Sequence, residues 1–259
     1  MFVGFNYSAS KYDFEDADYE IGKKLFEDQK RAIQSNLSTY LDKNGNINAK
    51  QLCEEWFPQI DVDIFLSHSH KDQELVISLA GWLYEHLGIT SFVDSCLWGY
   101  ANKIQRQIDN NCCVLKRDKN GNIKSYCYED RNQSTSHVHM ILNGALAKMI
   151  DRTECIMFVN TPNSLFLKNE EGNNQTYSPW IYSELLISRI VRKKPPRGYR
   201  EDVKKAISES YSDLKVKYDV DLTHLINLEI EDLKCVKSNS ITKDSRKNLD
   251  LLYEIVGVY

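Results

Sequence analysis

The sequence has 259 residues, of which 42% are hydrophobic and 27% are charged, and its formal net charge is −4 at pH 7. These proportions are those of an ordinary globular protein and exclude a largely disordered chain. The weakly acidic balance gives no general attraction to nucleic acid or to anionic lipid, so we expect neither as a partner. The first residues lack the pattern of a secretory signal, and no apolar run approaches the ~20 residues of a membrane span.

The seven cysteines form no CxxC pair, and no third ligand at metal spacing accompanies His137 and His139. The sequence therefore predicts no metal site. Without a secretory signal, the simplest interpretation of the cysteines is reduced thiols in a cytoplasmic protein.

Residues 1–60 are expected to form a helical extension that precedes the main domain. Apolar residues recur at roughly helical spacing from Tyr19 to Leu41, which predicts an amphipathic helix. The stretch Asp42 to Asn46 alternates oxygen ligands, but the positions that a calcium loop reserves for Gly and Glu hold Ile47 and Cys53. This stretch is therefore interpreted as a turn.

A buried strand and a polar loop follow at residues 61–72. Val62 to Leu66 is an apolar run typical of a strand covered on both faces, and it stops abruptly at Ser67. Ser69 and Asp72 have the spacing of a capping box at the start of a helix. In open α/β sheets ligands bind where a strand's carboxyl end meets a loop and a helix N-terminus. The alternative is an ordinary turn between strand and helix.

The next segment completes a βαβ unit. The apolar side chains from Leu75 to Leu87 mark one face of a helix, and Gly88 occupies its expected C-terminal cap. Ile89 to Val93 is a second strand, so the two strands are expected to be parallel with a right-handed crossover. A short helix is predicted over Ala101 to Ile108.

The middle of the chain predicts an inserted hairpin at about residues 110–130, because Asn120-Gly121 is typical of a two-residue type I′ turn. Its lysines and arginine could touch an acidic partner, although a solvated charged hairpin is the simpler interpretation. A helix from Val138 to Met149 and an apolar strand from Cys155 to Val159 follow. That strand also ends in a polar loop, Asn160 to Ser164.

The last part of the chain predicts three helices and a strand. Ser178-Pro179 has the residues of a helix N-cap and first turn, and Trp180 and Glu184 lie four residues apart on one face of that helix. Leu214 to Tyr218 is interpreted as the last strand. The segments from Leu222 to Leu233 and from Lys247 to Val256 are predicted to be amphipathic helices that pack on the main domain.

Four motifs together resemble a bacterial TIR (Toll/interleukin-1 receptor) domain in order and spacing. They are Asp63-Ile-Phe-Leu-Ser-His-Ser-His-Lys-Asp72, Ser91-Phe-Val-Asp94, Cys155-Ile-Met-Phe-Val-Asn160 and Trp180-Ile-Tyr-Ser-Glu184. The last matches the WxxxE helix motif of the family. The resemblance covers residues 61–220, and two features, residues 1–60 and the hairpin at about residues 110–130, are not part of a minimal domain of this kind.

The resemblance implies an α/β, flavodoxin-like fold with a parallel sheet flanked by helices. It also implies an NAD⁺ glycohydrolase or ADP-ribosyl cyclase that uses NAD⁺ as substrate and needs no cofactor, with Glu184 as the essential carboxylate. Similar prokaryotic proteins make an ADP-ribose-derived signal in anti-phage systems such as Thoeris. The expected partners are therefore other TIR domains in self-association and a downstream effector that responds to the product.

Five further residues are candidate substrate-binding groups. Ser67 and His68 lie in the loop after the first strand, Asp94 and Trp98 follow the second strand, and Trp180 precedes Glu184 by one helical turn. Trp180 could orient the glutamate or stack on a ring. The simpler alternatives are a loop residue for His68, a helix cap for Asp94 and core packing for the two tryptophans. For the candidate catalytic residue Glu184, the alternative is a solvated helix residue.

Two other functions fit the same residues. One is a non-catalytic TIR adaptor that acts by TIR–TIR assembly, in which the motifs are scaffold. The other is an N-glycosidase similar to nucleoside deoxyribosyltransferases, which also combines such a sheet with a glutamate.

Overall fold

The protein is described here from a computed structural model, which covers residues 1–10, 12–32, 61–167, 174–191, 193–194 and 218–258. The chain divides into two compact units. The sheet unit comprises Met1–Phe26, Asp61–Asp94 and Ile150–Tyr259, and the second unit comprises Glu27–Ile60 and Ser95–Met149. The units divide between residues 60 and 61, where the sequence also predicts a boundary, and residues on both sides of position 220 belong to the sheet unit.

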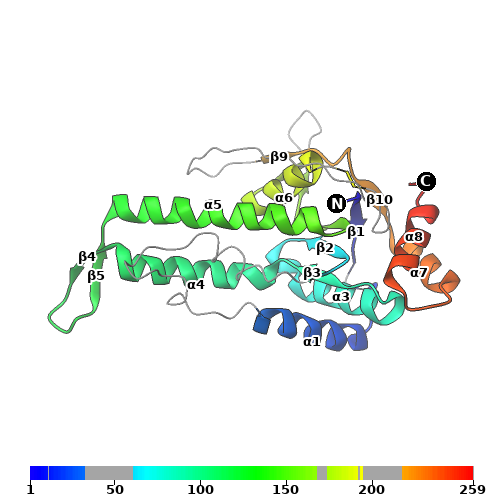
Figure 1. The fold of residues 1–259 in the computed structure, drawn as a ribbon, viewed down its shortest axis with the longest axis horizontal. Coiled ribbons are helices and arrows are strands. Elements are labelled where there is room, and N and C mark those ends of the chain that lie inside the picture. The colour runs from blue at the N-terminus through cyan, green and yellow to red at the C-terminus, as the bar shows by residue number, and fades with distance from the viewer. Residues whose placement is uncertain (11, 33–60, 168–173, 192, 195–217, 259) are drawn as a thin grey trace. The chain divides into compact units, whose positions relative to one another are not determined.

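The sheet unit is built on five strands in the order β10-β1-β6-β2-β3 (Figure 1). The strands are β1 (Val3–Ser8), β2 (Ile64–Ser67), β3 (Ser91–Val93), β6 (Cys155–Asn160) and β10 (Ile226–Leu228). All four pairings are parallel. Strands β2 and β3 and the first five residues of β6 are buried, as expected for a sheet covered on both faces. The predicted α/β class with a parallel sheet flanked by helices is confirmed and is consistent with a flavodoxin-like fold.

The strand order differs from the prediction at the N-terminus. Strands β3, β2 and β6 lie in the order 2-1-3 of a flavodoxin-like sheet, but the fourth place belongs to β1 and the fifth to β10. The expectation that residues 1–60 precede the sheet as a helical extension is therefore wrong for Val3–Ser8. In Val3–Ser8 apolar residues alternate along the sequence, and Phe5 and Tyr7 are fully buried. This alternation is the sequence pattern that indicates a strand there.

Two helices of the sheet unit cross with their backbones in contact. They are α1, which spans Asp16–Ala32, and α3, which spans Gln73–Leu87. A Cβ atom on Gly22 would lie 1.8 Å from the carbonyl oxygen of Ile77, and one on Gly81 would lie 1.9 Å from that of Asp18. Only glycine permits this approach. Helix α3 ends, as predicted, at Gly88 with φ 68°; the predicted continuation of α1 to Leu41 lies outside the described residues.

Helix α6 (Pro179–Ile190) lies on the other side of the sheet from α1 and α3 (Figure 1). Its predicted N-cap is confirmed, because the Ser178 hydroxyl accepts a hydrogen bond from the Ile181 amide at 3.2 Å. The helix packs with neighbouring segments in a small apolar core of Phe158, Leu165, Ile181, Leu185, Val220 and Leu225. The antiparallel strands β7 (Phe166–Leu167), β8 (Asn174–Thr176) and β9 (Tyr218–Val220) form a second sheet.

The C-terminal segment is only partly helical. The helix predicted from Leu222 to Leu233 is wrong in its first half, because Ile226–Leu228 forms β10 at the edge of the main sheet. Helix α7 (Ile230–Asn239) starts after it, and α8 (Ser245–Ile255) agrees with the second predicted helix. Tyr253 of α8 stacks on Phe5 and donates a hydrogen bond to Glu154 at 3.0 Å, which ties α8 to the sheet. The predicted strand Leu214 to Tyr218 lies outside the described residues except for Tyr218, where β9 begins.

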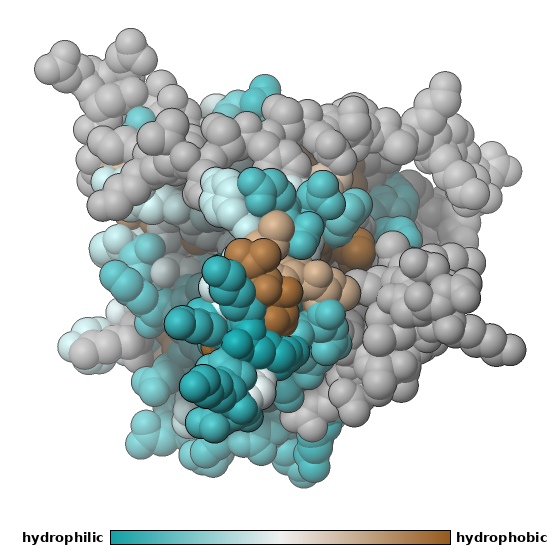
Figure 2. All heavy atoms as spheres, turned by 90° about the vertical axis from the view of Figure 1, so that its left-hand side faces the viewer, coloured by the Kyte–Doolittle hydropathy of each residue, from teal (hydrophilic) through white to brown (hydrophobic). Residues whose placement is uncertain are grey.

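Between Ser95 and Met149, the second unit contains two helices joined by the predicted hairpin. Helices α4 (Ser95–Cys112) and α5 (Tyr128–Arg152) are longer than predicted and flank β4 (Val114–Arg117) and β5 (Ile123–Tyr126). The two-residue type I′ turn is not formed: Asp118 donates its amide to Asn122, and Gly121, at φ 84°, closes a three-residue loop. On the face in Figure 2 hydrophilic residues surround a small apolar area; the exposed Leu115 belongs to the hairpin.

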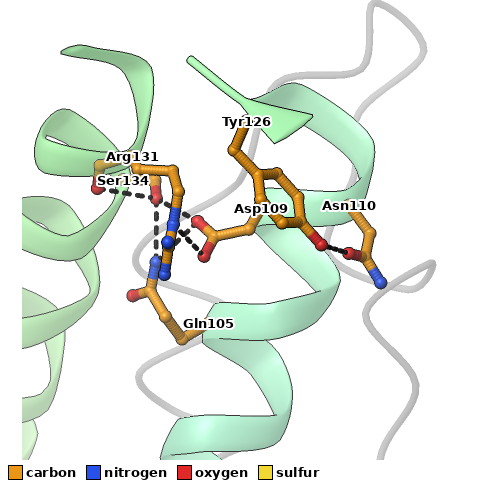
Figure 3. A network of polar contacts seen from close by, with 6 residues as sticks. All are labelled: Gln105, Asp109, Asn110, Tyr126, Arg131 and Ser134. Carbon is orange, nitrogen blue, oxygen red and sulfur yellow. Dashed lines mark hydrogen bonds and ion pairs between the residues drawn. The ribbon is translucent and has the colours of Figure 1, made fainter. Parts of the chain in front are cut away.

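A buried carboxylate joins the two helices of this unit. Asp109 of α4 accepts hydrogen bonds from Gln105 at 2.9 Å and from Ser134 of α5 at 2.7 Å, and it pairs with Arg131 at 3.0 Å (Figure 3). Beside it, Tyr126 of the hairpin donates to Asn110 at 2.5 Å. The buried charge is thus paired and hydrogen-bonded, as a charge removed from water requires.

Among the described helices of the whole chain, none is long and apolar enough to cross a membrane.

Candidate active site

Three of the predicted site residues meet at the carboxyl ends of two neighbouring strands. Ser67 is the last residue of β2, His68 follows it, and Asp94 follows β3. Because Leu66 pairs with Val93 in the parallel ladder, these ends lie side by side. His68 Nδ1 lies 2.6 Å from Asp94 Oδ1, and both side chains are buried.

Helix α6 brings Glu184 to the same place. The Glu184 side chain accepts a hydrogen bond from Ser67 Oγ at 2.5 Å across 117 residues of sequence. Glu184 is fully buried on the face of α6 that also buries Ile181 and Leu185. The carboxylate and the strand-end loop, which the sequence predicts separately, are thus in direct contact.

Burial and a neighbouring charge act together on Glu184. Removal from water raises the pKa of its carboxyl well above the usual value, and the charge and hydrogen bond of Asp94 raise it further, while the Ser67 hydroxyl lowers it. The protonated form of Glu184 is therefore favoured in the ligand-free protein.

The pKa of His68 is also raised, which for an imidazole favours the charged form. Burial lowers the pKa of its imidazole, but the charge and hydrogen bond of Asp94 and the backbone oxygen of Leu66 raise it, and the net pKa lies above the usual value. His68 Nδ1 also lies 3.3 Å from that oxygen. The contact with Asp94 therefore favours the protonated form of His68.

Two buried polar atoms of the cluster have no hydrogen-bond partner among the described residues. Glu184 Oε1 accepts no hydrogen bond from an N–H or O–H group there, and His68 Nε2 has no partner. An unsatisfied buried polar atom costs about 1–3 kcal/mol, and such atoms are otherwise rare in folded proteins. These two atoms are therefore candidate positions for a ligand.

The two tryptophans differ from the rest of the predicted site. Trp180 lies in the first turn of α6, one turn before Glu184, and is only partly buried. Trp98 lies in α4, in the second unit, and its side chain is outside the described part of the structure. Their roles toward a substrate stay predictions.

Asp72 has a function that the sequence did not reveal. The predicted Ser69 cap is present, but Asp72 does not complete a capping box: it accepts hydrogen bonds from Thr161 Oγ1 at 2.5 Å and Asn163 Nδ2 at 2.7 Å. Asp72 ends the 3₁₀ turn η2 (His70–Asp72) after β2, and Thr161 and Asn163 follow β6. These two hydrogen bonds hold the loop after β2 against the loop after β6. Both loops lie beside the point where the strand order of the sheet reverses, and ligands bind at that point in such folds.

No group of three or more His, Cys, Asp or Glu side chains with metal-binding geometry occurs in the described ranges.

No family model matches the sequence, and no curated protein and no solved structure is significantly similar to it. The structure itself defines the class: an α/β protein with a five-stranded parallel sheet and a buried acid–base cluster at the carboxyl ends of β2 and β3.

Proposed function

We propose that the protein cleaves the bond between nicotinamide and ribose in NAD⁺, with Glu184 as the catalytic carboxylate. The observation that carries the proposal is the buried Glu184 carboxyl, which is hydrogen-bonded to Ser67 and lies beside Asp94 at a sheet edge where nucleotides bind in related folds. The TIR-like motifs that contain these residues supply the identity of the substrate.

The chemistry requires few groups. As the bond to nicotinamide breaks, positive charge develops on the ribose, and a carboxylate beside that carbon stabilises it, as in glycoside hydrolysis. Nicotinamide leaves as a neutral ring and needs no proton from an acid. One ionised glutamate therefore suffices, provided that Glu184 has lost its proton when the substrate is in place.

The surrounding residues would position the dinucleotide. The loop from Ser67 to Lys71 and the loop held by Asp72 lie at the ends of β2 and β6, where the ribose or a phosphate would bind in such a fold. The product is a linear, cyclic or conjugated ADP-ribose. We further propose that this product is a cytoplasmic anti-phage signal read by a downstream effector, and that the enzyme acts with TIR–TIR self-association.

Nicotinamide release by purified protein tests the proposal. Glu184→Gln removes the charge without changing the shape of the side chain, and we expect a fall in turnover of at least about 10²-fold. The matched control is Glu85→Gln, the same change at an exposed carboxylate of α3 that pairs with Lys243, which leaves turnover unchanged. Undiminished release by folded Glu184→Gln protein contradicts the assignment. Nucleosides assayed beside NAD⁺ detect a deoxyribosyltransferase-like N-glycosidase.

One observation favours a second candidate, the non-catalytic TIR adaptor. Ser67, His68, Asp94 and Glu184 are each at most 4% exposed, which also suits a polar cluster that only supports the fold. In that case Glu184→Gln protein retains phage resistance in cells. Loss of resistance together with loss of nicotinamide release excludes the adaptor.

A further inference from the structure

The interaction between the Asp94 and Glu184 carboxyl groups restricts their charge states. Both side chains are buried in the cluster at the carboxyl ends of β2 and β3, where the charge of Asp94 acts on Glu184. Two carboxylates in one buried site do not both ionise readily, because like charges at short range repel strongly in a low dielectric.

The neighbours of each carboxyl decide which one holds the proton. Asp94 faces the imidazolium of His68 at 2.6 Å, which stabilises a carboxylate. Glu184 is hydrogen-bonded instead to the neutral hydroxyl of Ser67, at 2.5 Å. The proton therefore belongs on Glu184, which agrees with the direction of its pKa.

Two other titratable groups lie near the cluster. The charge of Asp72 raises the pKa of His68 and so strengthens the ion pair. Burial lowers the pKa of His70, which also interacts with Asp94, so His70 is neutral near pH 7 and adds no cation. Neither group changes the assignment of the proton.

We propose that Asp94 is a positioning residue for this site: with His68 it keeps one proton on Glu184 while the site is empty, and a cationic nicotinamide ring displaces that proton on binding. The identity of the ligand rests on the proposed function. The step is balanced: the O–H bond of Glu184 breaks, the proton leaves to solvent, and the positive charge of the ring compensates the carboxylate. A neutral ring, such as that of reduced NAD, does not release the proton.

Infrared spectroscopy of the ligand-free protein tests the first half of the proposal. A protonated carboxyl has a C=O band distinct from that of a carboxylate, and the wild-type minus Glu184→Gln difference spectrum isolates the band of Glu184. We expect this band at pH 7. Its absence at pH 7 overturns the proposal, whether or not the protein cleaves NAD⁺.

Two variants of the ion pair have opposite expected effects. Asp94→Asn removes the neighbouring negative charge, so the carboxyl band disappears at a pH lower by about one unit or more. His68→Gln removes the cation that compensates Asp94, so the band persists to higher pH. A merely structural role does not produce shifts of opposite sign, and equal midpoints in both variants overturn the proposal. If Asp94→Asn fails to fold by circular dichroism, the His68→Gln midpoint decides alone.

Calorimetry tests the second half with two probes that differ by one positive charge. Binding of 1-methylnicotinamide, measured at pH 7 in phosphate and in Tris, is expected to release about one proton per site in the wild type and none in Glu184→Gln. Nicotinamide, the neutral control, releases none. Equal release by both probes, or none by the cation, overturns the proposal. Neither probe has a ribosyl bond, so the result is independent of whether the proposed cleavage occurs.

Discussion

At the scale of single residues, the charge of Glu184 follows from its surroundings rather than from its identity. An exposed glutamate on a helix is ionised at neutral pH, whereas Glu184 is fully buried and lies beside Asp94. The sequence places the residue on a helix face but says nothing of these neighbours. Its charge state has a consequence for stability that is independent of catalysis.

The protonation of Glu184 is expected to make the free energy of unfolding depend on pH. The folded protein holds a proton on Glu184 above the usual pKa of 4.5, where the unfolded chain has lost it. The unfolded state then binds fewer protons, so the unfolding free energy falls as pH rises. Relative to Glu184→Gln, which does not titrate, the wild type is expected to lose up to about 1.4 kcal/mol per pH unit from pH 4.5 until the folded-state pKa is reached.

Urea unfolding of both proteins at several values between pH 5 and pH 8 gives the difference. Glu85→Gln serves as control: the hydrogen bond and charge of Lys243 lower the pKa of Glu85, so its contribution to stability is lost only as pH falls below the usual value of 4.5, and the profile of this variant between pH 5 and pH 8 is expected to parallel that of the wild type. Parallel pH profiles for the wild type and Glu184→Gln contradict the protonated state of Glu184.

At the scale of elements, the crossing of α1 and α3 depends on two glycines that face each other. Gly81→Ala places a methyl group 1.9 Å from the backbone oxygen of Asp18, so the helices must separate. We expect destabilisation of about 1–3 kcal/mol or more, as for overpacked cores. Gly144→Ala in α5 is the matched control: a Cβ there has nothing within 4 Å, and helix propensity alone predicts a gain of up to about 1 kcal/mol. Thermal unfolding distinguishes them, and equal effects contradict the close crossing.

At the scale of the whole molecule, the sheet requires β1 although the TIR-like motifs begin only at residue 61. Strand β1 lies between β6 and β10, and its Phe5 and Tyr7 are fully buried. A chain without residues 1–8 exposes the edge of β6 and loses these side chains from the core. We expect it to lose cooperative thermal unfolding by circular dichroism.

The control for this deletion is a chain in which a short Gly-Ser linker replaces the hairpin residues 114–126. The hairpin belongs to the second unit and supplies no strand to the main sheet, so cooperative unfolding is expected to remain. If the chain without residues 1–8 unfolds as the wild type does, β1 is not part of the folded sheet.

Elements whose signals are local could be predicted from the sequence. The apolar run that forms β2, the amphipathic helix α3 with its cap at Gly88, the hairpin, and the start of α6 at Ser178 all follow from patterns within about fifteen residues. The same patterns placed Ser67, Asp94 and Glu184 at strand ends and on a helix. These predictions succeed because backbone geometry and capping depend on near neighbours.

The places of β1 and β10 in the sheet and the protonation of Glu184 depend on contacts between segments that are far apart in the sequence. Val3 pairs with Cys155 and Phe5 with Ile226, and parallel strands leave no mark of such distant partners in the sequence. Likewise Asp72 has the spacing of a capping residue but binds Thr161, which competes successfully for its carboxylate. Electrostatics follows burial and distance in space, so the proton on Glu184 depends on the fold that brings Asp94 and Ser67 to it.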